Sequence, residues 1–330
     1  MPAVAIVVRT QNRPLLLDRA LGSITGQSFA DWECVIVNDG GDPGPVDALI
    51  DSLPAAHRDR VHAVHHEQAR GRWVSANAGV LATSAPLLTI HDDDDTWHPE
   101  FLQRAHDHLE AHPEADGAVS KVEIVWERSV GDRLEETGRE IFQEQLHDVT
   151  LADTLLFNRF VPIGLLYRRS LHQELGLYDE SLPVVGDWSF YLKVLQRGPL
   201  SYLGPTPYAY WHQRVGVTGS QGNSVIAEDG AHTRHDWLIR DEALREHVAE
   251  HGLGLVLYLT KYIDQRIVAA QEELRREHDL TRRVMVDQHD QTRHVTQGWL
   301  VRLVRFVKRR RRERAERAAG PDGGDGQFSR

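Results

Sequence analysis

The sequence predicts an α/β fold built on a mostly parallel sheet. Through the first half of the chain, short runs of β-branched residues alternate with helical patterns, which is typical of βαβ units. The predicted strands are continuous apolar runs, because strands of a parallel sheet are covered on both faces. Acidic turns follow two of these strands, at the end where open α/β sheets bind ligands.

The elements of the first half follow one another at short intervals. The predicted helices lie at 14–27, 47–53 and 71–82, between strands at 4–8, 34–38, 61–65 and 87–91. Proline suits the first turn of a helix, and apolar or small residues recur after Pro99 at helical spacing. A further helix is therefore expected over 100–112.

The second half is less regular and ends in helices. We expect a helix at 188–196, helical sequence from residue 226 onward, and strands at 117–127, 159–167 and 201–204. The segment 258–286 lacks proline and glycine and places Ile267, Leu274 and Val284 on roughly one side. Polar residues break its heptad pattern, so a packed helix is favoured over a coiled coil. The glycine-rich stretch 320–330 predicts a disordered tail.

Composition bounds the class of protein. The 330 residues suffice for one large or two modest domains, and no apolar run approaches the ~18 residues of a membrane-spanning helix. The first nine residues lack the regions of a secretory signal, so we expect a cytoplasmic protein. Cys34 is the one cysteine of the sequence, and we expect it to be a small buried hydrophobe.

Charge is distributed unevenly along the chain. The net charge is −11, yet the segment from Arg302 to Arg317 holds nine basic residues and two glutamates, which leaves −18 for the rest. The acidic remainder argues against a nucleic-acid partner. Over 299–309, apolar residues and cations recur at helical intervals, as in a helix that lies on an anionic membrane at the inner face of the cell. Docking on the acidic body or on another partner is the alternative.

Four consecutive carboxylates, Asp92 to Asp95, form the most distinctive local feature. They follow the predicted strand 87–91 and precede a helix, so they fall at the carboxyl end of the sheet. Such a cluster repels itself unless it is neutralised, and a divalent cation that also holds a diphosphate would do so. A solvated acidic turn that caps the helix at Pro99 is the alternative.

Two other polar segments end predicted strands. Asp39 follows the strand 34–38, where acidic residues of nucleotide sites accept a hydrogen bond from a base or ribose; a bare turn is the alternative. Thr10, Asn12 and Arg13 follow the first strand, just before a helix whose N-terminus would face an anion.

Together these segments resemble the family 2 glycosyltransferases of the GT-A fold, enzymes that pass a sugar from a nucleoside diphosphate to an acceptor. The resemblance covers roughly residues 3–215, and it implies a Rossmann-like, mostly parallel sheet. The chain departs from the family at Arg9, where proline is usual, and at Gly41, where serine is usual; we expect neither position to carry the chemistry. The matching residues are 4–13, Gln27-Ser28-Phe29, Trp32-Glu33, 37–40, Gly71, Asn77-Ala78-Gly79, 92–95, Trp97 and Pro99.

The resemblance implies a role for each of these polar residues. Thr10 and Asp39 would lie near the nucleotide base, and Asp92 or Asp93 near the ribose. Asp94 would hold Mg²⁺ or Mn²⁺ on the diphosphate, with the register open by one residue. The full nucleotide-binding set would be Thr10, Asn12, Arg13, Asp39, Asp92 and Asp93.

A third motif of the family, an acidic site followed by an aromatic residue on a helix, is matched by Asp187 and Trp188. Asp187 corresponds to the catalytic base, which takes the proton of the acceptor hydroxyl as that oxygen attacks the anomeric carbon. Gly186 stands where the family often has glutamate. A helix N-cap before Trp188 is the alternative for Asp187.

His212 is a candidate ligand of the metal or a phosphate. It ends a short apolar stretch and precedes the glycine-containing loop 216–220, and some family members place a ligand in a similar position. A satisfied surface histidine is the alternative. Arg214 beside it is a candidate contact for the diphosphate.

These observations predict an inverting, metal-dependent glycosyltransferase of the hexosyltransferase type. Residues 1–115 would bind the nucleotide sugar, 116–225 the acceptor, and 226–319 form a helical extension. The acceptor would be a glycan, a lipid-linked molecule or a small molecule, as in cell-envelope polysaccharide synthesis, and a homo-oligomer is compatible. A nucleotidyltransferase and an inactive GT-A scaffold are the alternatives. Against a nucleotidyltransferase, the sequence lacks the glycine-rich, lysine-bearing phosphate loop usual near the first strand. Against a scaffold, a protein without activity has no use for Asp39, Asp92 to Asp95 and Asp187 together.

Overall fold

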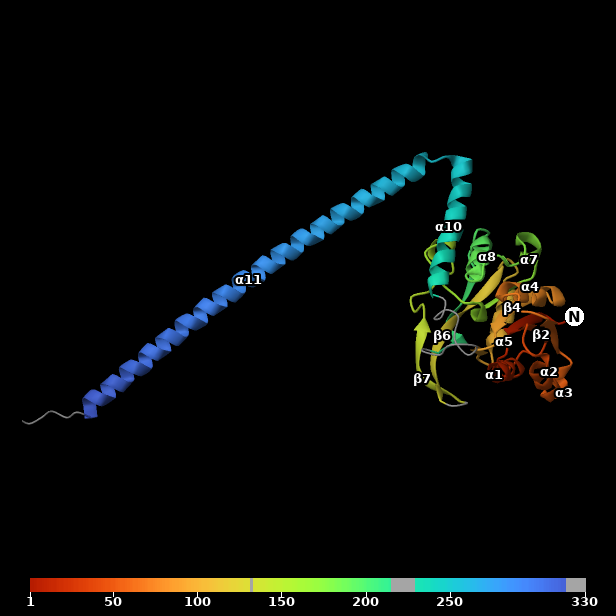
Figure 1. The fold of residues 1–330 in the computed structure, drawn as a ribbon, viewed down its shortest axis with the longest axis horizontal. Coiled ribbons are helices and arrows are strands. Elements are labelled where there is room, and N and C mark those ends of the chain that lie inside the picture. Colours follow the sequence, from red (N-terminus) through yellow and green to blue (C-terminus); the bar gives the residue numbers. More distant parts are fainter. Residues whose placement is uncertain (131–132, 215–228, 319–330) are drawn as a thin grey trace, which may run out of the picture. The chain divides into compact units, whose positions relative to one another are not determined.

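The computed structural model describes residues 1–130, 133–214 and 229–318. The predicted loop 216–220 and tail 320–330 lie outside these residues. Contacts divide the chain into two units, Met1–Ala243 and Leu244–Arg330. The first unit contains a nine-stranded sheet flanked by helices, and the second is helical (Figure 1). The α/β prediction is thereby confirmed, while the division at 115 and 225 stays a prediction.

The first half forms the parallel part of the sheet. Its strands pair in the order β3-β2-β1-β4, all in parallel. The strands are β1 Val4–Thr10, β2 Trp32–Asp39, β3 Val61–His66 and β4 Leu87–Asp92. Parallel strands end at a common edge, so the residues after β1, β2 and β4 meet there.

Helices cover both faces of this sheet, as the side chains of β1 show. Val4, Ile6 and Val8 belong to one core, and Ala5 and Val7 belong to the other. The first core is closed by α1 Pro14–Thr25, α2 Pro43–Ser52 and α5 Phe101–Ala111, and the second by α4 Arg72–Ala82. The short helix α3 Ala55–Arg58 precedes β3. Cys34 is fully buried in the first core, as predicted.

The second half extends the sheet with mixed pairing, in the order β4-β8-β6-β9-β5, with β7 paired to β6. Its helices are α6 Leu151–Thr154, the 3₁₀ turn η1 Pro162–Gly164, α7 Ser170–Leu175 and α8 Gly186–Leu195. Its strands are β5 Thr96–Trp97, β6 Gly117–Val130, β7 Arg133–Phe142, β8 Leu165–Arg168 and β9 Ser201–Arg214.

Three of these elements differ from the sequence-based predictions. The strand expected at 159–167 is reduced to β8, because Pro162 begins a 3₁₀ turn in its middle. The strand expected at 201–204 continues to Arg214, since β9 pairs with β6 along most of its length. The strand β7 was not predicted. Its residues are mostly exposed and polar, and antiparallel pairing with β6 forms it.

Two helices complete the described chain, α10 Asp229–His251 and α11 Gly254–Ala318. They are separated by Gly252, whose φ of 76° favours glycine. Arg240 of α10 donates to the carbonyl oxygens of Leu155 and Leu156 at 2.8 Å and lies over the ring of Trp188. The helical sequence predicted for this part of the chain is confirmed from residue 229, while 226–228 lie outside the described residues.

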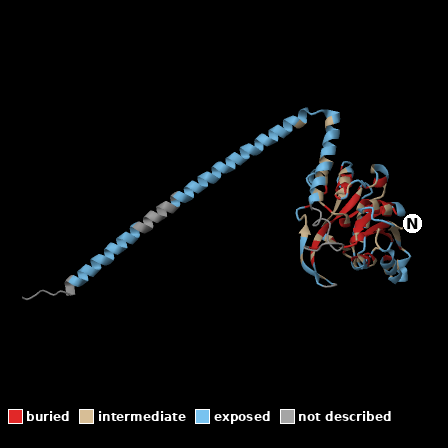
Figure 2. Cartoon of the chain, viewed as in Figure 1, coloured by how far each residue is buried: buried red, intermediate tan, exposed pale blue. Residues whose placement is uncertain are grey.

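The side chains of α11 are exposed along its described length (Figure 2). Ile267, Leu274 and Val284, predicted to lie on the buried side of a packed helix, are 52%, 65% and 47% exposed. These values describe the helix within its own unit, and the packed-helix prediction stays a prediction. Among the described residues, no helix is both long and apolar enough to cross a membrane.

The closest approach of helix and sheet gives a test of the packing. A Cβ atom at Gly79 of α4 would lie 2.2 Å from Cγ1 of Val7, whereas one at Gly22 of α1 would meet nothing within 4 Å. Gly79→Ala should lower the free energy of unfolding by about 1–3 kcal/mol, because the buried strand cannot yield. Gly22→Ala should be neutral or stabilise by up to about 1 kcal/mol. Urea unfolding of the full chain measures both, and equal midpoints for the two variants would contradict this packing.

Candidate active site

The candidate site lies at the common edge where β1, β2 and β4 end. The sequence predicted that Asp92 to Asp95 follow a buried strand, and the structure places Asp92 at the end of β4 with the other three in the turn to β5. Asp93, Asp94 and Asp95 are 3%, 8% and 2% exposed. The alternative of a solvated turn is therefore wrong. The next helix, α5, has Glu100 as its N-cap residue, without a side-chain capping bond.

Arginines from three different parts of the fold pair with Asp92, Asp93 and Asp94, whereas Asp95 accepts from the backbone N–H of His212. Because a buried carboxylate without a partner costs several kcal/mol, each guanidinium is needed for the turn to stay buried. The ion pairs are Arg9 with Asp92, Arg13 with Asp93 at 3.0 Å and with Asp94 at 3.5 Å, and Arg214 with Asp94 at 2.5 Å.

Glu127 of β6 joins the same network and was not predicted from the sequence. Its carboxylate accepts from Arg19 at 2.5 Å, from Arg214 at 3.2 Å and from Nδ1 of His212 at 2.8 Å. Burial alone would raise the pKa of Glu127, but the hydrogen bond from His212 and the charge of Arg19 outweigh it and lower the pKa to about 2. The signal available in the sequence was that Glu127, a charged residue, falls within the predicted strand 117–127.

His212 is brought to the cluster, as the sequence predicted, and both ring nitrogens have protein partners. Nδ1 faces Glu127, and Nε2 lies 2.8 Å from Oγ1 of Thr96. Its backbone N–H donates to Asp95 at 2.9 Å. Burial lowers the pKa of His212, which favours the neutral ring.

A divalent cation at Asp94 would find a suitable oxygen donor. Within the described ranges, no group of three or more histidine, cysteine, aspartate or glutamate side chains is arranged to hold a metal. Mg²⁺ commonly uses one or two carboxylates and takes its other ligands from substrate phosphates and water. The carboxylate of Asp94 therefore suits a cation that binds together with a diphosphate. The described residues do not suit a metal that is held by protein ligands alone.

Thr10 and Arg13, both predicted for the nucleotide, converge on Asp93. The hydroxyl of Thr10 donates to Oδ2 of Asp93 at 2.7 Å, while Arg13 pairs with Oδ1. Burial and the neighbouring charge of Asp94 raise the pKa of Asp93. Arg13 is also the N-cap residue of α1, so its guanidinium lies at the positive end of a helix.

Asp39 and Asn12 lie beside this network and hold loops at the end of β2. Asp39 accepts from the backbone N–H groups of Arg70 and Gly71 at 2.8 and 2.9 Å, and pairs with His66 at 2.9 Å. Burial alone would raise the pKa of Asp39, but these hydrogen bonds outweigh it and lower that pKa. Asn12, in the left-handed region at φ 54°, accepts from the backbone N–H of Asp42. Asp39 and Asn12 thus fix the loops that border the candidate site.

Asp187 lies in the first turn of α8 and is partly exposed. The N-cap residue of α8 is Val185, without a side-chain capping bond, so the N-cap alternative for Asp187 is wrong. Oδ2 of Asp187 accepts from the side-chain amide of Asn158 at 2.9 Å. Removal of water by the surrounding protein raises the pKa of Asp187, against the opposing effects of the Trp188 N–H and of Arg9.

Arg9 was expected to carry no chemistry, and the structure places it inside the site. It is 9% exposed and pairs with Asp92. Its guanidinium carbon lies 5.0 Å from the ring centroid of Trp73. The signal in the sequence was a cation at the end of a buried strand, at a position where the resembled family has proline.

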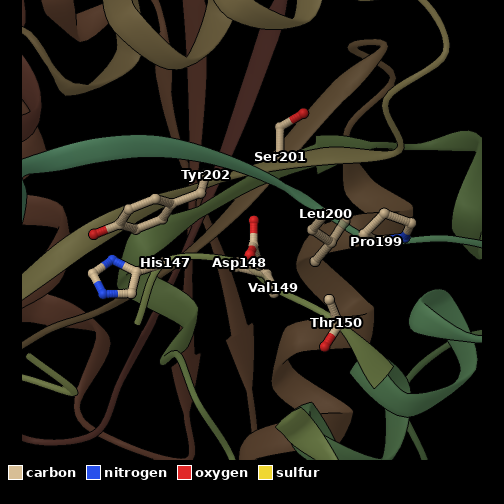
Figure 3. A pocket seen from close by; sticks show the side chains of 8 residues that line it. All are labelled: His147, Asp148, Val149, Thr150, Pro199, Leu200, Ser201 and Tyr202. Atoms are coloured by element: carbon tan, nitrogen blue, oxygen red, sulfur yellow. The ribbon is translucent and has the colours of Figure 1, made fainter. Parts of the chain in front are cut away.

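A separate hollow of about 420 Å³ lies between the segments 147–150 and 199–202 (Figure 3). The side chains of His147 and Tyr202 lie at one end of it, and Pro199 and Leu200 at the other. None of its lining residues belongs to the network of ion pairs. The hollow therefore contributes nothing to the chemistry described above.

Comparison with known proteins shows which family the chain resembles. The model described as glycosyl transferase family 2 matches residues 5–176. The uncharacterized glycosyltransferase YwdF of Bacillus subtilis is 34% identical over 192 residues, which cover 58% of this chain and 67% of the relative. A PGL/p-HBAD biosynthesis glycosyltransferase of Mycobacterium bovis is 27% identical over 194 residues, 58% of this chain and 69% of the relative.

Solved structures with a similar fold include S. aureus TarS. Residues 1–349 of TarS in complex with UDP-GlcNAc align with a TM-score of 0.54 and 19% identity, over 76% of this chain and 75% of that one. The complex with UDP aligns with a TM-score of 0.52 and 20% identity, over 63% and 60%. The chain thus spans about three fifths to three quarters of these relatives, and the likeness concerns the fold.

The buried pairing of Glu127 predicts a pH dependence of stability. The folded-state pKa of about 2 lies below the ordinary 4.5, so the pairing contributes its full stabilisation above pH 4.5 and loses it as the pH falls toward 2. Glu127→Gln should therefore lower the free energy of unfolding by about 1–3 kcal/mol at pH 7, and by less at each step below pH 4.5. Urea titrations from pH 7 to 3 measure this. Glu140→Gln, on exposed β7, is the matched control. A difference that stays constant with pH would contradict the assignment.

Proposed function

The chain belongs to glycosyl transferase family 2, and we propose that it transfers a sugar from a nucleoside-diphosphate donor to a hydroxyl group of an acceptor, with inversion at the anomeric carbon and with a divalent cation. The acceptor is a glycan, a lipid-linked molecule or a small molecule. TarS was crystallised with UDP and with UDP-GlcNAc, which supports a nucleotide-sugar donor.

One contrast among the carboxylates carries this proposal. Asp92, Asp93 and Asp94 are each ion-paired with an arginine, whereas Asp187 is hydrogen bonded to the neutral amide of Asn158. A general base has to be able to accept a proton, and its pKa works best near the operating pH. The raised pKa of Asp187 supports this role. The pKa of Asp93 is raised as well, but the two oxygens of that carboxylate are already occupied by Thr10 and Arg13.

The diphosphate would bind where the arginines already gather. Arg13 and Arg214 both reach Asp94, so phosphate oxygens arriving there would share these guanidinium groups with the carboxylate. The N-terminus of α1 begins at Arg13 and adds its backbone N–H groups. A Mg²⁺ or Mn²⁺ ion held by Asp94 would supply further charge to offset the departing diphosphate.

In this scheme the residues of the chain divide the work. Asp187 takes the proton of the acceptor hydroxyl, and Asn158 orients the carboxylate through its amide. Arg13 and Arg214 hold the diphosphate, and Thr10 fixes Asp93 on the ribose side. Burying so many charges costs free energy, so a scaffold without activity would gain nothing from keeping them.

The basic end of α11 supports a second, separate proposal, that the enzyme is peripheral at the inner face of the cell membrane. Trp299, Leu303 and Phe306 are exposed on this helix and share one side of it. Arg302, Arg305 and Arg309 form a neighbouring stripe, about 60–120° around the helix from Trp299. An interfacial helix buries such an apolar side among acyl chains and turns its cations to anionic headgroups.

Nucleotide binding and catalysis can be tested separately. Thermal unfolding is measured with UDP, GDP, dTDP and CDP, with and without Mn²⁺, because a ligand of the folded state raises Tm. We expect one nucleotide to stabilise the protein only with Mn²⁺, and Asp94→Asn to reduce that shift. Asp187→Asn should keep the shift and lose at least about 100-fold in the rate of nucleoside-diphosphate release from the corresponding sugar nucleotide.

The control for these variants is Asp51→Asn, which lies on the exposed side of α2. It should match the wild type in both measurements. Normal turnover by Asp187→Asn would refute its role as the base. Tm shifts that are independent of Mn²⁺ and of Asp94 would refute the metal site.

The membrane proposal predicts that the protein binds anionic vesicles less tightly when basic residues at the end of α11 are replaced by neutral ones. Arg302→Gln, Arg305→Gln and Arg309→Gln combined should weaken binding to vesicles of phosphatidylglycerol and phosphatidylcholine by about 100-fold, at ~1 kcal/mol per basic residue. Sedimentation measures the bound fraction. Arg275→Gln, Arg282→Gln and Arg283→Gln, earlier on the same helix, form the matched control. Undiminished sedimentation of the first variant, or of a chain ending before Trp299, would remove the proposal.

A further inference from the structure

Arg9 is the buried cation of the site that has no place in the scheme above. It ends β1 with its side chain 9% exposed, and its guanidinium pairs with Oδ1 of Asp92. A second N–H group reaches the carbonyl oxygen of Arg72 at 3.5 Å. Because a buried guanidinium costs several kcal/mol unless it is paired, its presence here calls for a specific role.

Trp73 joins Arg9 to the helix that carries Asp187. The indole is 3% exposed, and the Arg9 guanidinium lies over it at 5.0 Å, a cation–π contact. The same ring touches the start of α8, where a Cβ atom at Gly186 would lie 2.6 Å from Nε1 of Trp73. Glycine at 186 thus permits an approach that any larger residue would block. Trp73 therefore fixes the distance between Arg9 and the residue before Asp187.

The surroundings of Asp187 contain several charged and titratable groups. Arg9 and Arg72 favour the ionised carboxylate, Asp92 opposes it, and the amide of Asn158 donates to it. The phenol groups of Tyr178 and Tyr191 also interact with Asp187, and both are held neutral because burial raises the pKa of each. The groups that act electrostatically on Asp187 or hydrogen bond to it are Arg9 from β1, Arg72 from α4, Asp92 from β4, Asn158 after α6, Tyr178 before α8, and Tyr191 within α8.

We propose that Arg9 is a positioning residue of the transfer reaction, a fixed positive charge that the Asp92 ion pair and the Trp73 ring hold against the start of α8, the helix that carries Asp187. The inference rests on the proposed role of Asp187 as the base. This role would account for three features together. Arg9 supplies a cation near the end of β1, the ring of Trp73 supports that cation, and Gly186 leaves room for the ring to reach α8.

The consequence for catalysis is a dependence on pH. A positive charge close to a carboxylate lowers its pKa, so the loss of Arg9 raises the pKa of Asp187 above its already raised value. The base would then remain protonated up to a higher pH. The acidic limb of the profile of kcat/KM against pH, which reports the free enzyme's base, should move to higher pH.

The test compares Arg9→Met, which removes the charge, with Arg9→Lys, which keeps it. Release of nucleoside diphosphate is measured from pH 5 to 9 with the full chain, using the sugar nucleotide whose diphosphate raises Tm most. Arg9→Met should shift the acidic limb upward by about one pH unit, so that its activity falls about 10-fold on that limb and recovers at pH 9. Arg9→Lys should keep the wild-type limb, and Arg104→Met, on the exposed side of α5, should leave the profile unchanged.

The outcomes separate this inference from the proposed function. If Arg9→Met loses the same factor at every pH, Arg9 serves only the structure and the inference is overturned. Should that variant not fold, Trp73→Leu supplies the test, because it removes the ring that holds Arg9 and should shift the limb in the same direction. An unshifted limb in Trp73→Leu would then overturn the inference. Full activity of Asp187→Asn, in contrast, would overturn the proposed base and leave the ion pair of Arg9 with Asp92 untouched.

Discussion

The pairing of buried carboxylates with arginines at one edge of the sheet is the constraint on which the rest of the structure depends. The turn after β4 places three aspartates out of water, and each charge there costs several kcal/mol without a partner. Arg9, Arg13 and Arg214 come from β1, the start of α1 and the end of β9. Neutralisation therefore links the first strand of the fold to its last.

The same network assigns different chemistry to similar side chains. Arg214 is 1% exposed and reaches both Asp94 and Glu127, so these two acids stay close without repelling each other. Asp187 lies outside these pairs and accepts from an amide. Similar carboxylates thus lie in different environments, some paired with arginines and one hydrogen bonded to an amide, which is the kind of difference from which active sites obtain different functions of one residue type.

Much of the parallel half of the fold was predictable because its signal is local. Continuous apolar runs mark β1, β2 and β4, and the polar residues after them meet at one edge as a geometric consequence of parallel pairing. The later strands were harder. β7 is polar and exposed and exists through its pairing with β6, while η1 interrupts a run that reads as a strand. Pairing partners and local turns of this kind leave little trace in hydrophobic periodicity.

By itself, the sequence determined the α/β class and the family. It also named Thr10, Arg13, Asp92 to Asp94, Asp187 and His212 as candidates, because these follow strand ends or match ordered motifs. Tertiary structure alone decided how their charges are satisfied. Arg9 and Asp92 are 83 residues apart, and Arg214 and Asp94 are 120 apart. No local pattern encodes such pairs, since they form only when the sheet has brought distant strand ends together and water has been removed from between them.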